Sequence, residues 1–60
     1  MPADHFEVYQ DRSRFFRRFR WRRVAANGRV IADSGQGYTR KWSAKRAALR
    51  QDPRLRIVEL

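Results

Sequence analysis

The sixty-residue chain contains no cysteine, which excludes a disulfide framework and a thiolate metal site. It has no apolar run long enough to span a bilayer, and it has only two prolines and three glycines. A chain of this length buries only roughly 60% of the surface that it exposes when unfolded. We therefore expect one domain, residues 1–60, that gains stability by pairing with a second copy.

Acidic residues are scarce: six Asp and Glu stand against fifteen Lys and Arg, so the net charge is +9. A field of this sign attracts nucleic acid, anionic lipid head groups or an acidic protein. Arginine supplies thirteen of the basic side chains, which favours planar, bidentate contacts to phosphate or carboxylate. The first ten residues lack the basic and apolar regions of a signal peptide, so the expected location is cytoplasmic, or a virion or host cytoplasm for a viral protein.

Apolar periodicity predicts a run of strands followed by a helix. Residues 5–10 alternate apolar and polar side chains, which is the period of a half-buried strand. Thr39 is a candidate N-cap for the helix, and Asp52-Pro53 ends it. The predicted strands are residues 5–10, about 15–26, about 29–34 and 55–60, and the helix reaches about Gln51. The expected fold is α+β, a β-β-β-α-β unit with an antiparallel sheet and one helix.

Asn27-Gly28 lies between two strand-like runs and predicts a hairpin with a two-residue loop. The expected turn is type I′, which requires positive φ at both central residues. This loop pairs Ala26 with Arg29. Stepping outward, the predicted pairs are Ala25 with Val30, Val24 with Ile31, Arg23 with Ala32, and Arg22 with Asp33.

Side chains alternate between the two faces of a sheet, so this register divides the second and third strands into two sets. The predicted core face carries Phe15, Phe19, Trp21, Ala25, Val30 and Ala32, together with Arg17 and Arg23. The opposite face carries Phe16, Arg18, Arg20, Arg22, Val24, Ile31 and Asp33. A lone buried guanidinium is too costly, so Arg17 and Arg23 must reach an edge, pair with a carboxylate or reveal an error of register.

In the helix, Ala44, Ala47 and Ala48 share one narrow side, whereas Trp42 and Leu49 share nearly the opposite one. The helix therefore has no coherent apolar face flanked by its charges, as binding at a membrane surface would require. We expect no membrane among the partners of the chain.

A series of short motifs occurs in order along the chain: "FEVY", then "FRWR" leading into "VAANGRVIADSGQGY", then "SAK" in the helix and "IVEL" at the end. Together these motifs resemble the YegP-like family of small proteins of unknown function. The resemblance covers nearly the whole chain and implies a β3-α unit followed by a last strand. It also implies a homodimer with one continuous sheet, formed by swapping C-terminal strands. It brings no activity with it, because the function of that family is unknown.

The chain offers no catalytic constellation, since it has one histidine and its carboxylates show no paired spacing. His5 is interpreted as a solvated imidazole near the amino terminus rather than a general base or a metal ligand. Gly35, Gly37 and Thr39 precede the helix, but their spacing fits no nucleotide-binding fingerprint and favours a turn from strand to helix. We expect no enzymatic activity, no cofactor, no metal and no small-molecule substrate.

The second strand carries the strongest candidates for binding a partner. Arg18, Arg20 and Arg22 lie on one face about 6.6 to 6.8 Å apart, close to the spacing of successive phosphates along a nucleic-acid strand. Stacking of bases would need aromatic rings on this face, where Tyr9 and Phe16 are the only candidates, so stacking recognition of single strands is under-supported. Further basic candidates are Arg29 at the hairpin tip and Arg40, Lys41, Lys45, Arg46 and Arg50 on the helix.

Two functions stay open at this point. The first is a nucleic-acid-binding module held by phosphate contacts, mostly without sequence preference. The middle of the chain also resembles integrase arm-binding domains, which lay a three-stranded sheet in the major groove, and that resemblance implies a monomer. The second is a structural or protein-interaction homodimer whose basic surface meets an acidic protein; Arg22 is then simply paired with Asp33 on an exposed sheet face. The residues assigned to nucleic-acid binding are Arg18, Arg20, Arg22, Arg29, Arg40, Lys41 and Lys45.

Overall fold

A computed structural model describes residues 4–12 and 17–60 of the chain. Its elements are β1 (His5–Arg12), β2 (Arg17–Val24), β3 (Val30–Asp33), α1 (Lys41–Gln51) and β4 (Ile57–Glu59). The α+β class and the β-β-β-α-β order predicted from the sequence are confirmed. The core position predicted for Phe15 and the open-face position predicted for Phe16 lie outside the described residues.

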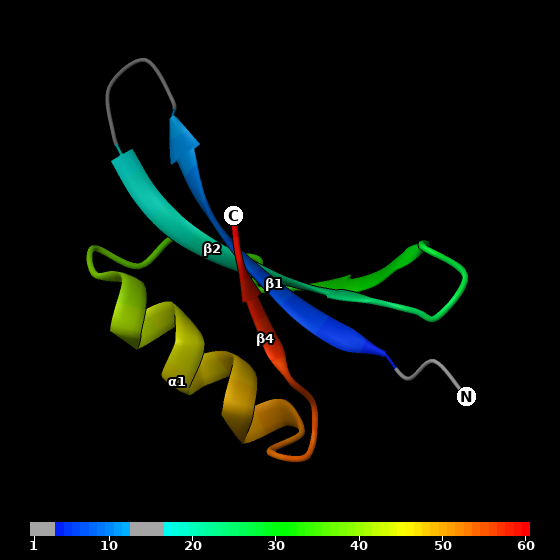
Figure 1. The fold of residues 1–60 in the computed structure, drawn as a ribbon. Coiled ribbons are helices and arrows are strands. Elements are labelled where there is room, and N and C mark those ends of the chain that lie inside the picture. Colours follow the sequence, from blue (N-terminus) through cyan, green and yellow to red (C-terminus); the bar gives the residue numbers. More distant parts are fainter. Residues whose placement is uncertain (1–3, 13–16) are drawn as a thin grey trace.

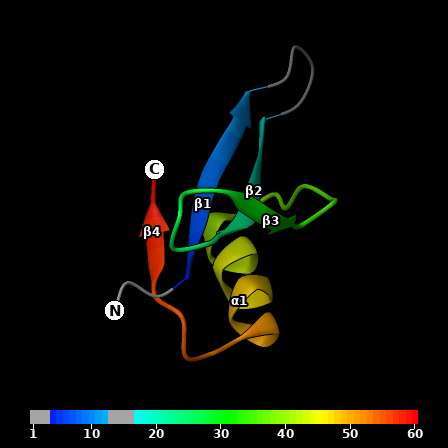
Figure 2. The ribbon, with the colours of Figure 1, turned by 90° about the vertical axis from the view of Figure 1, so that its right-hand side faces the viewer.

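The four strands form one sheet in the order β3-β2-β1-β4, as Figure 2 shows. β2 is antiparallel to both β1 and β3, whereas β4 is parallel to β1, with Phe6 opposite Ile57. The expectation of an antiparallel sheet is therefore wrong for β4. The reason is the crossover: α1 carries the chain back along the sheet, so β4 resumes the direction of β3, which is also that of β1.

The hairpin between β2 and β3 has three loop residues rather than two. The Ala25 N–H donates to Arg29 O at 2.8 Å, the Gly28 N–H donates to Ala25 O at 2.8 Å, and Gly28 has φ +88°. In the described part of the chain no residue other than glycine has positive φ, so Asn27 does not adopt the type I′ conformation.

A change of register follows from the longer loop. Val24 pairs with Val30, so the predicted pairs Ala25–Val30 and Val24–Ile31 are wrong. An irregularity between Arg23 and Val24 absorbs the extra loop residue. The outer pairs, Arg23 with Ala32 and Arg22 with Asp33, are confirmed as predicted.

The core lies between α1 and the face of the sheet formed by β1, β2 and β4. Phe6 and Trp21 meet edge to face there, with ring centroids 5.4 Å apart. Ala44 and Ala48 of α1 are fully buried against them, so the alanine side of the helix is its packing side. Small side chains there let the helix lie close to the rings. The buried residues of this cluster are Phe6, Val8, Trp21, Ala44 and Ala48, and Phe19, Tyr38, Ala47, Leu55 and Ile57 pack around them.

Three predicted burial assignments are reversed at the far end of the sheet. Val30 and Ala32, predicted in the core, are exposed, Val30 to 54%. Figure 1 shows the cause: the β2–β3 hairpin projects away from α1, so α1 does not cover β3. Val24, predicted on the open face, is only 6% exposed, although it lies outside the cluster that α1 covers.

The N-cap of α1 lies one residue later than predicted. Arg40 is the N-cap, with extended backbone and no side-chain capping hydrogen bond, so the assignment of Thr39 as the cap is wrong. Tyr38, which lies two residues before this N-cap, exchanges two backbone hydrogen bonds of 2.7 Å with Phe19. This bridge ties the segment before α1 to the edge of β2. The helix ends at Gln51 as predicted, with Asp52 as its C-cap, and Pro53 cannot continue it.

Candidate nucleic-acid interface

The predicted arginine row of β2 lies on the face of the sheet that α1 does not cover, directly opposite carboxylates of β1. Glu7 is the register partner of Arg22, and the Arg22 Nε–H donates to Glu7 Oε1 at 2.7 Å. On the diagonal, the Arg20 Nε–H donates to Asp11 Oδ2 at 2.9 Å. The Arg22 guanidinium also lies over the Tyr9 ring, 4.9 Å from its centroid. Acidic partners on β1 thus offset much of the positive charge of this face.

Glu7 is held by two partners at once. Besides Arg22, the His5 ring lies beside it, with Nε2 3.1 Å from Glu7 Oε2. Hydrogen bonding by His5 and then by Arg22 lowers the pKa of the Glu7 carboxyl below its ordinary value. The side chains of His5 and Glu7 are each only 19% exposed, so the interpretation of His5 as a solvated imidazole is wrong.

The glycine-containing loop after β3 is a structural turn, as its spacing suggested. Asp33 Oδ1 accepts a hydrogen bond of 2.9 Å from the Gly35 N–H. Asp33 forms no ion pair with Arg22, because the carboxylate partner of Arg22 within residues 4–12 and 17–60 is Glu7. The predicted Arg22–Asp33 ion pair is therefore wrong, although the two residues are opposite each other. Further along the loop, Gly37 packs on the Arg18 stem, where an added Cβ would lie 2.6 Å from Arg18 Cβ.

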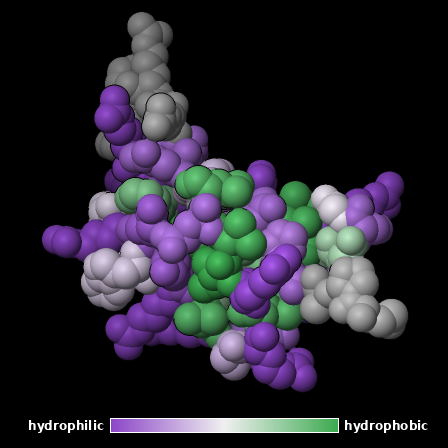
Figure 3. Space-filling model, in the orientation of Figure 1, coloured by the Kyte–Doolittle hydropathy of each residue, from purple (hydrophilic) through white to green (hydrophobic). Residues whose placement is uncertain are grey.

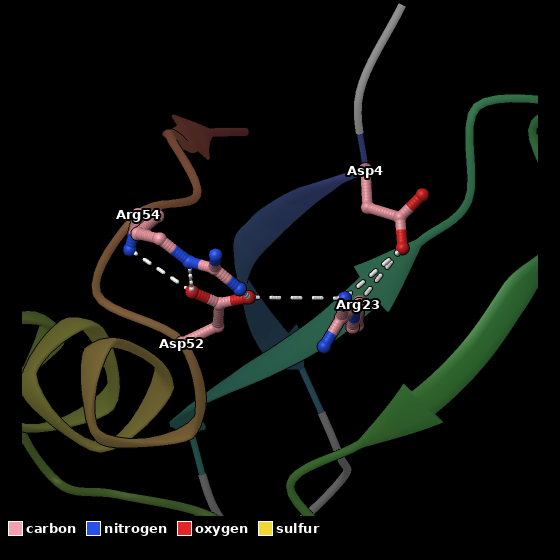
Figure 4. Close-up of polar contacts among 4 residues, drawn as sticks. All are labelled: Asp4, Arg23, Asp52 and Arg54. Carbon is pink, nitrogen blue, oxygen red and sulfur yellow. Dashed lines mark hydrogen bonds and ion pairs between the residues drawn. The ribbon is translucent and has the colours of Figure 1, made fainter.

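Arg23 lies on the helix-facing side of β2, where the sequence required it to find a carboxylate. Figure 4 shows its guanidinium between Asp4 and Asp52, at 3.1 Å and 4.0 Å. Arg54 holds the other side of Asp52 with a hydrogen bond of 3.1 Å and lowers the pKa of that carboxyl. Arg17, the other arginine of this face, is exposed. The predicted pairing with a carboxylate is confirmed for Arg23, whereas Arg17 avoids burial because it is exposed at the start of β2.

The second basic surface is the outer side of α1. Glu59 of β4 accepts ion pairs from Lys45 at 3.3 Å and Lys41 at 3.5 Å, and these cations lower the pKa of its carboxyl, Lys45 most. Arg40, Arg46 and Arg50 are exposed and form no ion pair with any described residue. The predicted set is thus divided: Arg18, Arg20 and Arg22 lie on the open sheet face, Arg29 is exposed at the hairpin tip, and Arg40, Lys41 and Lys45 belong to the helix.

One feature of this helical surface was not predicted. A groove of about 370 Å³ runs between α1 and the segment before it. The spacing of Trp42, Arg46 and Arg50 at i, i+4 and i+8 would have indicated a shared helix side, but no local pattern indicates what lies beside it. Its lining residues are Gln36, Tyr38, Trp42, Ser43, Arg46, Ala47 and Arg50.

The described chain contains no group of three His, Cys, Asp or Glu side chains placed to hold a metal ion. Nor does any helix in residues 4–12 and 17–60 combine the length and the apolar character needed to cross a bilayer.

Comparison with the profiles of known protein families identifies the family of the chain. The profile described as "Domain of unknown function (DUF1508)" matches residues 17–48, more than half of the sequence. The chain belongs to this family. The match runs from the start of β2 into α1, and it confirms the resemblance to the YegP-like proteins of unknown function. Searches of curated proteins and of solved structures returned no match.

Proposed function

We propose that this DUF1508 protein is a small, non-enzymatic module that binds nucleic acid through the phosphate backbone, with the outer side of α1 as its main contact surface. The observation that carries the proposal is the distribution of charge. Between residues 34 and 51 the chain has five basic side chains and no acidic one. Within the described chain, Arg40, Arg46 and Arg50 have no carboxylate partner to displace before they meet a phosphate.

The sheet face becomes a secondary surface in this proposal. Its Arg20 and Arg22 already donate to Asp11 and Glu7, and a phosphate would have to compete with both carboxylates. Arginines held in this way retain only part of their attraction for a polyanion. The predicted row of arginines therefore contributes less than its spacing suggested, and the helix contributes more.

Fluorescence anisotropy of labelled nucleic acid, titrated with the full chain over a range of salt concentrations, tests the proposal. Counterion release makes binding tightest at low salt, and each phosphate contact steepens the salt dependence. Replacing Arg46 and Arg50 together with Gln is expected to reduce the slope of log K against log salt by about two. The matched control replaces Arg20 and Arg22 with Gln and is expected to change the slope less.

Three results would contradict this function. Absence of binding at low salt would exclude it. A larger loss of slope for the Arg20 and Arg22 replacements would move the main contact back to the sheet. Binding of polyglutamate as tight as that of nucleic acid would favour the second function, in which the basic surface meets an acidic protein.

A homodimer is part of the proposed arrangement, and the surface over β4 supports it. Figure 3 shows apolar surface running over β4, and Leu60 is 64% exposed. β4 is held on β1 through the Phe6 N–H to Arg56 O and the Leu60 N–H to Val8 O, each at 2.9 Å. A second copy of the chain could supply the same strand to β1, as in a swapped dimer. Light scattering at several protein concentrations tests this, and a monomer at all of them would exclude it.

A further inference from the structure

The groove beside α1 combines an exposed aromatic ring with two arginines that form no ion pair within the described chain. Trp42 is 58% exposed, whereas the buried cluster under the helix uses Ala44 and Ala48. The indole of Trp42 is therefore not needed for the core. A volume of about 370 Å³ lies at the lower end of the range for sites that hold small organic groups.

The two arginines of the groove follow Trp42 along one side of the helix. Successive positions four residues apart are neighbours about one turn, roughly 5.4 Å, apart along the axis. Arg46 and Arg50 are both exposed, and neither forms an ion pair with the described residues, in contrast to Lys41 and Lys45, which share Glu59. The groove thus places a flat ring one turn before two successive guanidinium groups that have no carboxylate partner among residues 4–12 and 17–60.

The opposite wall is held in position by the sheet. Tyr38 is bridged to Phe19 by two backbone hydrogen bonds of 2.7 Å, and the Gln36 Nε2–H donates to the Tyr38 hydroxyl at 3.1 Å. These bonds fix a second aromatic side chain and an amide on the groove wall facing α1. A ligand bound there would meet apolar ring surface, hydrogen-bonding groups and positive charge together.

We propose that this groove holds an unpaired nucleobase stacked on Trp42, with the adjoining phosphates bound by Arg46 and Arg50. The inference rests on the proposed function and adds that the chain prefers single-stranded nucleic acid. Bases in a duplex are stacked on each other and cannot offer a ring face to Trp42, whereas every unpaired base can. An acidic peptide would satisfy the arginines but has no base to place on the indole.

Binding of oligo(dT) and of an oligo(dT)·oligo(dA) duplex, measured by anisotropy at equal salt, tests the inference. The wild-type chain is expected to bind oligo(dT) several-fold more tightly than the duplex. Trp42→Ala is expected to lose about tenfold on oligo(dT) and to leave duplex binding unchanged, and Trp42→Phe to retain part of the difference. Leu49→Ala is the matched control, because Leu49 is exposed on the same helix side but does not line the groove.

Tryptophan fluorescence supplies a second measurement. Trp21 is buried, so quenching by oligo(dT) is expected to come from Trp42 and to disappear in Trp42→Ala. Equal affinity for the two forms, or an equal loss on both forms in Trp42→Ala, would overturn the groove assignment and leave the proposed function intact. Absence of binding to both forms at low salt would instead overturn the proposed function itself.

Discussion

Glu7 and Arg22 face each other across the β1–β2 pair, and the Arg22 Nε–H donates to Glu7 Oε1 at 2.7 Å. This contact shows why an arginine row is not by itself a binding surface. The carboxylates opposite the row lie on β1: Asp11 is nine residues before Arg20, and Glu7 is fifteen residues before Arg22. Their effect on the charge of the sheet face appears only when the two strands are paired.

Neutralising one carboxylate on each side of the molecule distinguishes the two basic surfaces. Glu59→Gln releases Lys41 and Lys45 on the helical side, so it is expected to tighten nucleic-acid binding a few-fold. Glu7→Gln releases Arg22 on the sheet face and is expected to tighten binding less. Anisotropy titrations of the two variants in parallel check this. If Glu7→Gln tightens binding more than Glu59→Gln, the main contact lies on the sheet.

Acid is expected to destabilise the fold through three carboxyls. Glu7, Asp52 and Glu59 have pKa values lowered by hydrogen bonds from their basic neighbours, below the ordinary values of 4.5 for Glu and 3.8 for Asp. A carboxyl with a lowered pKa in the folded state stabilises the fold above its unfolded pKa. That stabilisation is lost as the pH falls through the folded value. The free energy of unfolding should therefore decrease below about pH 5.

Urea unfolding between neutral pH and about pH 3, followed by tryptophan fluorescence, measures this dependence. Glu7→Gln removes one of the three groups, so its free energy of unfolding should fall less steeply with acid than that of the wild type. An identical decrease in both proteins would show that the His5 and Arg22 contacts to Glu7 do not contribute to the acid response.

Gly37→Ala is expected to destabilise the chain by roughly 1–3 kcal/mol, because the added Cβ would lie 2.6 Å from Arg18 Cβ and backbone must move to relieve the overlap. Gly35→Asn is the matched control. Gly35 has φ +68° with open space around it, and Asn tolerates this conformation better than other residues with a side chain. Thermal unfolding of both variants checks the order, and a greater loss for Gly35→Asn would contradict the packing of Gly37 on Arg18.

Trp21→Phe is expected to cost much less stability than Phe6→Ala. Trp21 Nε1 is buried and has no hydrogen-bond partner among the described residues, so removing it eliminates an unsatisfied donor that costs about 1–3 kcal/mol. That gain offsets part of the loss of packing. Phe6 is fully buried, and its truncation should cost about 3–5 kcal/mol, close to the whole stability of a chain this small. Urea midpoints of the two variants measure the difference, and equal losses would contradict it.

Local sequence patterns were sufficient to predict much of the fold. The alternation in residues 5–10, the hairpin signal at Asn27-Gly28 and the stop at Asp52-Pro53 were enough to predict the order of the five elements. The side of β2 that bears Phe19 and Trp21 was also predicted correctly. These features depend on side chains a few residues apart, whose preferences are expressed before any distant contact forms.

Contacts between distant segments decided the rest. The parallel pairing of β4 with β1 depends on the crossover through α1. Val30 is exposed because α1 packs on the sheet away from β3. The candidate site follows the same division. Arginine at alternate positions of β2 was visible in the sequence, but the carboxylates that accept hydrogen bonds from these arginines come from β1. The groove at Trp42 depends on the bridge between Tyr38 and Phe19, which holds the loop that contains Tyr38 beside α1. Sequence periodicity cannot indicate such a contact.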